Sequence, residues 1–307
     1  MKISKGWKWF LGVFGVLVIG LWVEKIILID LYPTLDEDGF SVDLEKVRAM
    51  AKADSSEMPI RLNSLLIAIE NVPEFATYAG GGLTEVSMSM RVHQVVYANQ
   101  TVMIDPVHDE LLHRQNNYGG PYFPEAFTQM QEAMKKASLI LSTHEHFDHI
   151  GGVSRSPFFE SIRSKVLLTE EQLSSPEILK AGFVSEMLAQ FDGIHYEDYH
   201  SPAPGIVLIK SPGHTPGHQM IYLQLLDGTE YLFVGDIAWS KRNIYEIKGR
   251  PKLVSMLLNE DVMAVAYQLR WLNHLSTSES IHILVSHDHP DQMKQMEENL
   301  YTDKLEF

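Results

Sequence analysis

Apolar residues at alternate positions predict a set of strands in the stretch that begins near residue 60. The alternation is regular across 86–97, and shorter apolar stretches cover 62–69 and 101–105. A period of two is typical of a strand with one buried face. Residues 99–100, Asn-Gln, are the expected hairpin turn between the second and third of these strands. This part of the chain is therefore expected to form a meander of strands.

Apolar residues three or four positions apart predict helices before, between and after these strands. Helices are expected at 42–53, 125–136, 170–174, 184–190 and 256–275. Further short apolar runs predict strands at 166–168, 205–209, 220–225, 231–234 and 282–285. Strands, then helices, then strands again indicate an α/β protein whose sheets are covered by helices.

The first 31 residues have a different pattern. Lys2, Lys5 and Lys8 precede the apolar run 9–23, and a second apolar stretch follows at 26–29. Counted from residue 6 to residue 31, this segment is long enough to span a bilayer. The lysines predict an inside amino terminus, with the rest of the chain on the outer, periplasmic or extracytoplasmic side. We expect an uncleaved N-terminal apolar helix that anchors the chain in the membrane. A removed signal peptide, which would leave a secreted protein, and a buried or interfacial helix are the alternatives.

Three histidines and an aspartate follow a short apolar run within residues 139–152. His144 and His146 are two positions apart, so at a strand end they share a face and can bind one cation together. Asp148 and His149 come after the turn and can reach a second cation nearby. Packed here without a metal, these four side chains would leave buried donors and acceptors unpaired, which costs free energy. The residues therefore predict two adjoining half-sites for metal ions.

This arrangement, His-x-His-x-Asp-His followed by Gly-Gly, resembles the signature of the metallo-β-lactamase superfamily. Three later segments resemble the remaining motifs of that family in the family's order: Ser-Pro-Gly-His-Thr-Pro-Gly-His at 211–218, Phe-Val-Gly-Asp at 233–236 and Leu-Val-Ser-His-Asp at 284–288. The resemblance covers roughly residues 60–290. It implies seven metal ligands, in which Asp236 bridges a first site of His144, His146 and His214 and a second site of Asp148, His149 and His287.

The resemblance also implies the fold and the reaction. Residues 59–307 are expected to form an αββα sandwich of the metallo-β-lactamase type, after the anchor or signal segment at 1–31 and a linker with an amphipathic helix at 32–58. Nitrogen and carboxylate ligands suit two divalent cations, for which we expect Zn²⁺ with Mn²⁺ or Fe²⁺ as alternatives. A hydroxide between the ions would be the nucleophile, with Asp148 and Asp236 as the catalytic carboxylates. Di-iron flavoproteins of the superfamily carry glutamate where this chain has His146, so a redox function is disfavoured.

The expected substrate is a small ester, lactone or thioester, because lactonases of this superfamily share the ligand set. A phosphodiesterase, a β-lactam hydrolase and a non-catalytic metal-binding module are the alternatives. The bridging aspartate argues against a β-lactamase, and only 20 residues follow His287, too few for the carboxy-terminal region of glyoxalase II. The net charge of -15 argues against a nucleic-acid partner. The chain has no cysteine, so disulfides and thiolate ligands are excluded. Oligomeric state is left open.

Several other residues have candidate roles near the site. The glycine-containing loops 79–82 and 116–122 are candidate pocket rims, with ordinary turns as the alternative. Residues 104–105 stand where the family has Ile-Asp-Thr-Gly, but Pro-Val replaces Thr-Gly. The basic stretch 239–252 is expected to be a solvated loop, with anion binding as the alternative. Residues expected to orient metal ligands are His218, Asp288 and His289. Histidines expected to be structural or on the surface are His93, His108, His113, His195, His200, His274 and His282.

Overall fold

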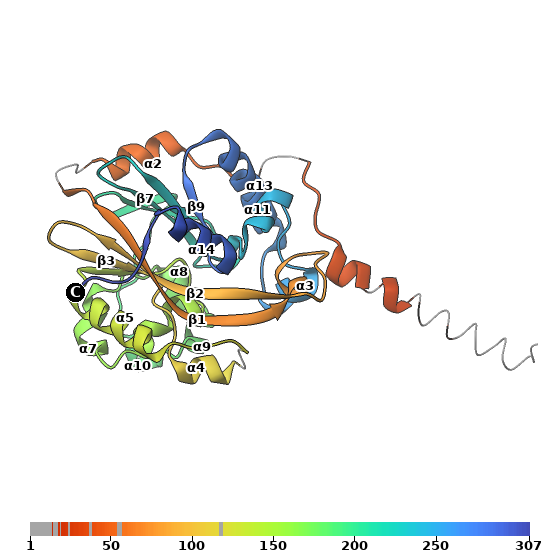
Figure 1. The fold of residues 1–307 in the computed structure, drawn as a ribbon, viewed down its shortest axis with the longest axis horizontal. Coiled ribbons are helices and arrows are strands. Elements are labelled where there is room, and N and C mark those ends of the chain that lie inside the picture. The colour runs from red at the N-terminus through yellow and green to blue at the C-terminus, as the bar shows by residue number, and fades with distance from the viewer. Residues whose placement is uncertain are drawn as a thin grey trace, which may run out of the picture.

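Two five-stranded sheets form the centre of the protein (Figure 1). The computed structural model describes residues 14, 18, 20–23, 25–36, 39–53, 57–116 and 119–307. The first sheet has the order β10-β1-β2-β3-β4, with bounds Thr302–Asp303, Arg61–Pro73, Glu85–Val96, Thr101–Ile104 and Leu139–Leu141. The second has the order β5-β6-β7-β8-β9, with bounds Tyr199–Ala203, Ile206–Lys210, Gln219–Gln224, Glu230–Phe233 and His282–Leu284. The predicted meander is confirmed, and β1 extends further than expected.

Each sheet ends in a parallel pair of strands that positions the site, and the first sheet has a second, short parallel pair between β1 and β10. Strand β3 runs parallel to β4, with Ile104 opposite Leu141. Strand β8 runs parallel to β9, with Phe233 opposite Leu284. Parallel neighbours bring their carboxyl ends to the same edge of a sheet. The residues that follow these four strands therefore meet at one end of the molecule.

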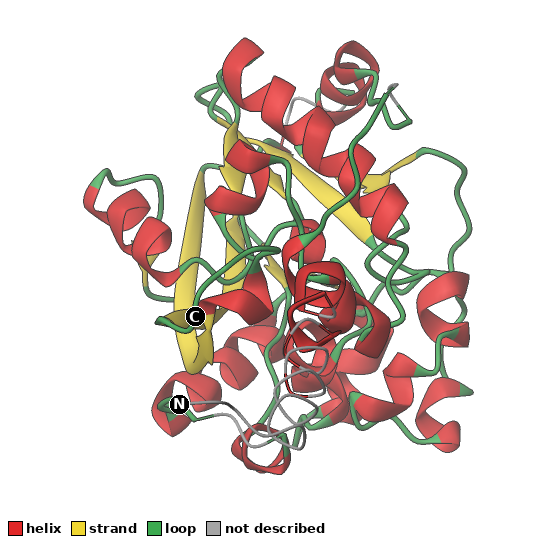
Figure 2. Cartoon of the chain, turned by 90° about the vertical axis from the view of Figure 1, so that its right-hand side faces the viewer, coloured by secondary structure: helices red, strands yellow, loops and turns green. Residues whose placement is uncertain are grey.

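The two sheets face each other, and helices cover both outer faces (Figure 2). Side chains of both sheets, such as Val95, Ile104, Leu208 and Phe233, form the cluster between them. The outer face of the first sheet is covered by α5, α6 and α7, with bounds Pro124–Lys136, Phe147–Ser154 and Phe159–Ile162. The outer face of the second sheet is covered by α2, α11 and α13, with bounds Leu44–Ala51, Lys241–Glu246 and Val262–Ser278. The predicted α/β class with two sheets is confirmed.

Two predicted elements were wrong. The long helix at 256–275 is two helices, α12 (Lys252–Leu257) and α13. Asn259 between them has a φ of 54°, in the left-handed region that ends a helix, and Asp261 caps α13 by accepting from the backbone N–H groups of its first turn. The predicted strand at 166–168 is a single bridge between Val166 and Ile140. The spacing of apolar residues cannot distinguish one continuous helix from two consecutive helices, because the apolar pattern continues across the break.

The predicted N-terminal anchor lies largely outside the described residues. Residues 1–13, 15–17, 19 and 24 are not among them, whereas residues 20–23 and Lys25 are helical and lead into the π-helical turn η1 (Ile26–Asp30). In the ranges that the structure describes, no helix is both long enough and apolar enough to cross a membrane. The anchor and the localisation that depends on it stay predictions.

Candidate metal centre

The histidine-rich motif occupies the turn between β4 and α6. Strand β4 ends at Leu141, and α6 begins directly after His146. The helix then passes close to the segment after β3, because a side chain at Gly152 would place its Cβ only 2.7 Å from the carbonyl oxygen of Val107. Glycine is required for this approach, so the Gly-Gly after the histidines lets α6 hold the motif against the sheet edge.

Four side chains converge on a first site. His146 Nδ1 lies 3.0 Å from both His144 Nε2 and His214 Nε2. Asp236 Oδ2 lies 3.4 Å from His214 Nε2 and 3.8 Å from His144 Nε2. Zinc–nitrogen bonds of about 2.0 Å in a tetrahedral site place ligand atoms about 3.3 Å apart. The four atoms therefore have the spacing of a zinc site.

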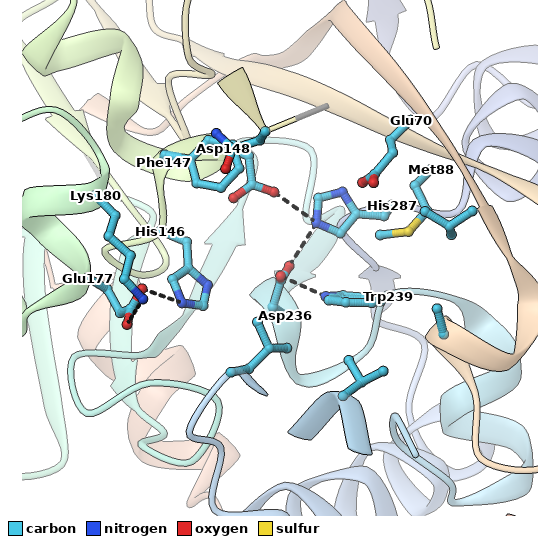
Figure 3. Close-up of a pocket in the computed structure, with 15 residues that line it drawn as sticks. Glu70, Met88, His146, Phe147, Asp148, Glu177, Lys180, Asp236, Trp239 and His287 are labelled. Carbon is cyan, nitrogen blue, oxygen red and sulfur yellow. Dashed lines mark hydrogen bonds and ion pairs between the residues drawn. The ribbon is translucent and has the colours of Figure 1, made fainter. Parts of the chain in front are cut away.

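The second site uses the other oxygen of the same aspartate. Asp236 Oδ1 lies 3.1 Å from His287 Nε2 and 3.2 Å from His149 Nε2. Asp148 Oδ2 completes the group, 3.5 Å from His287 Nε2 and 3.7 Å from His149 Nε2. Figure 3 shows the carboxylates of Asp236 and Asp148 both directed at the same nitrogen of the His287 ring, Nε2. Asp236 thus gives one oxygen to each site, the geometry of a bridging ligand.

Two buried atoms without hydrogen-bond partners fit a cation in the second site. His149 Nε2 and Asp236 Oδ1 are buried and have no hydrogen-bond partner among the described residues. Such atoms are costly to bury unless something satisfies them. A divalent cation accepts electron pairs from both imidazole nitrogen and carboxylate oxygen. The structure brings together all seven residues predicted as ligands, and their coordination of metal stays a prediction.

Comparison with known proteins gives relatives in one group of enzymes. No protein-family model matches the chain. The N-acyl homoserine lactonase AiiA of Bacillus thuringiensis subsp. kurstaki is 30% identical over 106 residues, 34% of this chain and 40% of that protein. An N-acyl homoserine lactonase of a Bacillus species is 27% identical over 104 residues. The matched stretch spans about two fifths of the length of these curated relatives.

Solved structures match over most of the chain. An N-acyl homoserine lactone hydrolase with N-hexanoyl-L-homoserine bound at its catalytic metal centre aligns with a TM-score of 0.61 at 15% identity, covering 77% of this chain and 96% of that chain. A probable metal-dependent hydrolase from Staphylococcus aureus aligns with a TM-score of 0.53 at 17% identity, covering 75% and 90%. The chain has the metallo-β-lactamase fold. This confirms the resemblance drawn from the four motifs.

Within this metallo-β-lactamase fold, an aspartate after β3 orients one histidine. Asp105 Oδ2 lies 3.0 Å from His149 Nδ1, and Asp105 Oδ1 accepts from the backbone N–H of Thr143 at 2.7 Å. The carboxylate fixes the ring so that Nε2 points to the second site. The sequence analysis noted residue 105 only as the Asp of an altered Ile-Asp-Thr-Gly motif and gave it no contact with a metal ligand. Its place directly after β3, beside the strand that carries the motif, was the signal for this role.

A buried ion pair orients His214. Its Nδ1 lies 2.9 Å from Glu260 Oε1, and Glu260 in turn pairs with Arg250 and accepts from the Ser255 hydroxyl at 2.7 Å. The guanidinium of Arg250 also lies over the ring of Trp239, at 4.7 Å from its centroid. Trp239 Nε1 donates to Asp236 Oδ2 at 2.7 Å, so the same group reaches the bridging carboxylate.

The prediction of a solvated loop at 239–252 was therefore wrong for Arg250, whose side chain is fully buried. Elsewhere in this basic stretch, the Arg242 side chain is half-exposed and pairs with Glu74 and Glu246. Composition alone could not separate the two arginines, because burial depends on where the stretch packs in the fold. No anion site follows from these contacts.

Of the residues predicted to orient ligands, His218 lies beside a ligand, whereas Asp288 does not hold His287. His218 lies beside the first site, with its ring centroid 5.4 Å from that of His144 and its Nδ1 3.0 Å from the Ser211 hydroxyl. Asp288 caps α14 (His289–Glu297) and accepts from the backbone N–H of Lys241. The partner of His287 Nδ1 is the Ser89 carbonyl oxygen, at 2.9 Å. Strand β2 thus supplies the contact that was expected from Asp288.

Without cations, the two sites differ in charge. Burial alone would raise the pKa of Asp236, but the imidazoliums of His287 and His149 hold it well below its usual range. Burial opposes charge on His149, yet Asp236, Asp148 and Asp105 raise its pKa well above the ordinary value. Asp236 likewise raises the pKa of His287 against the effect of burial. In the first site, burial lowers the pKa of His144, so this ring is neutral and ready to bind.

Metal loading is therefore expected to release protons from the second site. Coordination needs neutral imidazole, so His149 and His287 must each lose the proton that the carboxylates stabilise. Zinc titration at neutral pH should release about one to two protons per chain, measured by calorimetry in buffers of different ionisation enthalpy. Affinity at this site should fall as the pH is lowered. Binding without proton release would contradict the charge state described above.

A cavity of about 390 Å³ opens onto both sites. Val72, Met88 and Trp239 form apolar parts of its wall, and Figure 3 shows Glu70 of β1 beside His287. Burial, helped by the charge of Asp148, raises the pKa of Glu70 to about 7. No sequence motif marks Glu70, because it lies within an ordinary strand pattern. Of the predicted rim loop 116–122, Asn116 lines the cavity, while residues 117–118 lie outside the described part.

Proposed function

We propose that this protein is a dinuclear metal hydrolase that opens small lactones. The observation that carries the proposal is the shared carboxylate of Asp236, whose two oxygens face two separate groups of histidine and aspartate side chains. Two zinc ions held by these residues would supply hydroxide near neutral pH and polarise the carbonyl oxygen of an ester. The similarity to lactonases that are named as metal-centred or dizinc enzymes supports this proposal.

The chain's own residues would bind the substrate and hold the reacting groups in place. Val72, Met88 and Trp239 offer an apolar wall for an acyl chain. Trp239 Nε1 fixes one oxygen of Asp236, and Asp148 extends from the start of α6 into the same cavity. Asp236 and Asp148 therefore present fixed carboxylate oxygens in the cavity, where they would hold the two cations in place. Such pre-organisation is what allows a hydrolytic site to stabilise charge that develops during reaction.

The charge of the cavity favours a neutral substrate over a phosphodiester or a β-lactam. Among the described residues that line it, Lys180 is the sole lysine or arginine, and its Nζ pairs with Glu177 Oε1 at 2.7 Å. Glu70 and Glu177 add carboxyl groups to the wall. Away from the two zinc ions, a substrate with its own negative charge would meet these carboxyl groups with Lys180 as the sole lysine or arginine in the described lining. A lactone has no such charge.

A substrate panel tests the proposal. The full chain is loaded with zinc, its metal content is measured, and lactones, thioesters, β-lactams and phosphodiesters are assayed together. We expect two zinc ions per chain and the highest kcat/KM for lactones. A His195→Ala variant is the matched control, since His195 is exposed and lies outside the two metal groups. Turnover of phosphodiesters alone, or a chain that binds no zinc, would contradict the proposal.

A further inference from the structure

Large apolar side chains are exposed on the elements that surround the cavity mouth. Helix α12 lines the cavity through Val254, yet its Met256 and Leu257 are 64% and 77% exposed. Helix α9 (Glu177–Lys180) lines the cavity through its ends and exposes Leu179. Exposed apolar groups on the elements that line a binding cavity favour a surface that contacts another apolar phase.

The same arrangement recurs on the other sides of the mouth. Helix α4 (Glu110–Gln115), capped by the cavity residue Asn116, exposes Leu111. The loop that hydrogen-bonds to α3 (Glu74–Thr77) through Gly82 exposes Leu83. We call Leu83, Leu111, Leu179, Met256 and Leu257 together the mouth surface.

The N-terminal segment continues the mouth surface. The turn η1 packs against α12 and exposes Ile27, and Leu31 after it is also exposed. Before η1, Leu21 and Trp22 are 67% and 63% exposed. Figure 1 shows this helical segment projecting beyond α3, and Figure 2 views the molecule from that side. The N-terminal segment therefore exposes apolar side chains outside the domain, and it contacts the mouth surface at α12.

We propose that the mouth surface docks on a phospholipid bilayer, so that the cavity takes amphiphilic substrates with an apolar chain directly from the lipid. The substrate part of this proposal rests on the lactone hydrolysis proposed above, and the docking part does not. Interfacial binding of this kind needs an apolar area that enters the headgroup region, without a helix that spans the membrane.

Three features favour a bilayer over a protein partner. The exposed apolar residues are spread over four separate short elements that line or adjoin the cavity, which suits an extended apolar phase better than one bound peptide. The segment that joins them at α12 continues in the sequence as the apolar run 9–23, preceded by Lys2, Lys5 and Lys8. An apolar run of this kind in the sequence suits contact with lipid, and Trp22 is a residue type enriched at the lipid–water interface.

Vesicle binding by the full chain tests the proposal. Sedimentation with phosphatidylcholine vesicles is compared for the wild type, the double variant Met256→Glu/Leu257→Glu and the control Leu226→Glu. Leu226 is 65% exposed in the turn between β7 and β8, away from the cavity lining. We expect the double variant to bind vesicles at least about tenfold more weakly, because two side chains that would enter the headgroup region become charged. Leu226→Glu should bind like the wild type.

Each outcome distinguishes bilayer docking from self-association or from loss of the fold. Unchanged vesicle binding by the double variant, or no binding by the wild type, would overturn the proposal. A lower sedimentation coefficient for the double variant than for the wild type, measured without vesicles, would assign the mouth surface to self-association. That result would also overturn the proposal of bilayer docking. Circular dichroism and zinc content confirm that the variants are folded. Turnover of a short-chain, water-soluble lactone should be unchanged in the double variant. If no form hydrolyses any lactone, the proposed function fails, while the vesicle result still decides docking.

Discussion

An Asp236→Ala variant is expected to lose at least about a thousandfold in kcat/KM, which corresponds to about 4 kcal/mol of transition-state stabilisation. The side chain is buried, and its two oxygens face the histidines of both sites at 3.1 to 3.8 Å. Removing it would take one ligand from each cation and would leave the Nε2 atoms of His149 and His287 without their closest carboxylate. Zinc per chain should fall together with activity, measured by atomic absorption on the same samples.

The matched control for this variant is Asp227→Ala. Asp227 lies in the exposed turn after β7, where it accepts from the backbone N–H of Thr229. Its removal should leave zinc content and kcat/KM at the wild-type level. If Asp236→Ala kept two ions and full turnover, the bridging role would have to be abandoned.

An Arg250→Met variant is expected to lose about 3–5 kcal/mol of unfolding free energy, because it breaks a buried ion pair by removing one partner. Arg250 and Glu260 have exposed fractions of 0% and 1%, so the carboxylate would stay buried with no cation beside it. Methionine keeps much of the side-chain volume, so the loss reports the unpaired charge more than a cavity. Urea unfolding of the zinc-free protein gives the difference as a shift in midpoint.

Arg242→Met provides the comparison, since Arg242 comes from the same basic stretch but is 47% exposed. Exposed pairs contribute about 1 kcal/mol or less, so this variant should unfold near the wild-type midpoint. Because Glu260 also holds His214, Arg250→Met should in addition weaken zinc binding. Equal midpoints for the two arginine variants would show that the Arg250–Glu260 pair does not stabilise the fold.

The sequence predicted the part of the centre whose residues stand close together in the chain. The spacing of His144, His146, Asp148 and His149 indicated two half-sites, because strand and turn geometry over six residues leaves little freedom. The later ligands, His214, Asp236 and His287, were identified through the family's order of motifs. Their residue types and spacing alone would not have marked them as ligands. The structure places all of them around the same two points.

The groups that orient the ligands were harder to predict, because each comes from a distant part of the chain. Asp105 follows β3 and reaches His149, and Glu260 precedes α13 and reaches His214. Asp105 at least follows a predicted strand, whereas Glu260 is a single carboxylate with no pattern that distinguishes it from a surface residue. Glu260 was hidden further because the predicted helix 256–275 ran through it, whereas the observed break places it in a buried turn.

The division of ligands between the two sheets gives the cations a mechanical role. The segment after β4 supplies His146 to the first site and His149 to the second, and the segments after β6 and β9 of the second sheet supply His214 to the first site and His287 to the second. Each cation would therefore act as a cross-link between the halves of the sandwich. Removal of the cations by a chelator should weaken the contact between the two sheets. Backbone amide protons in β4 and β9 should then exchange with solvent faster, although neither strand contains a ligand.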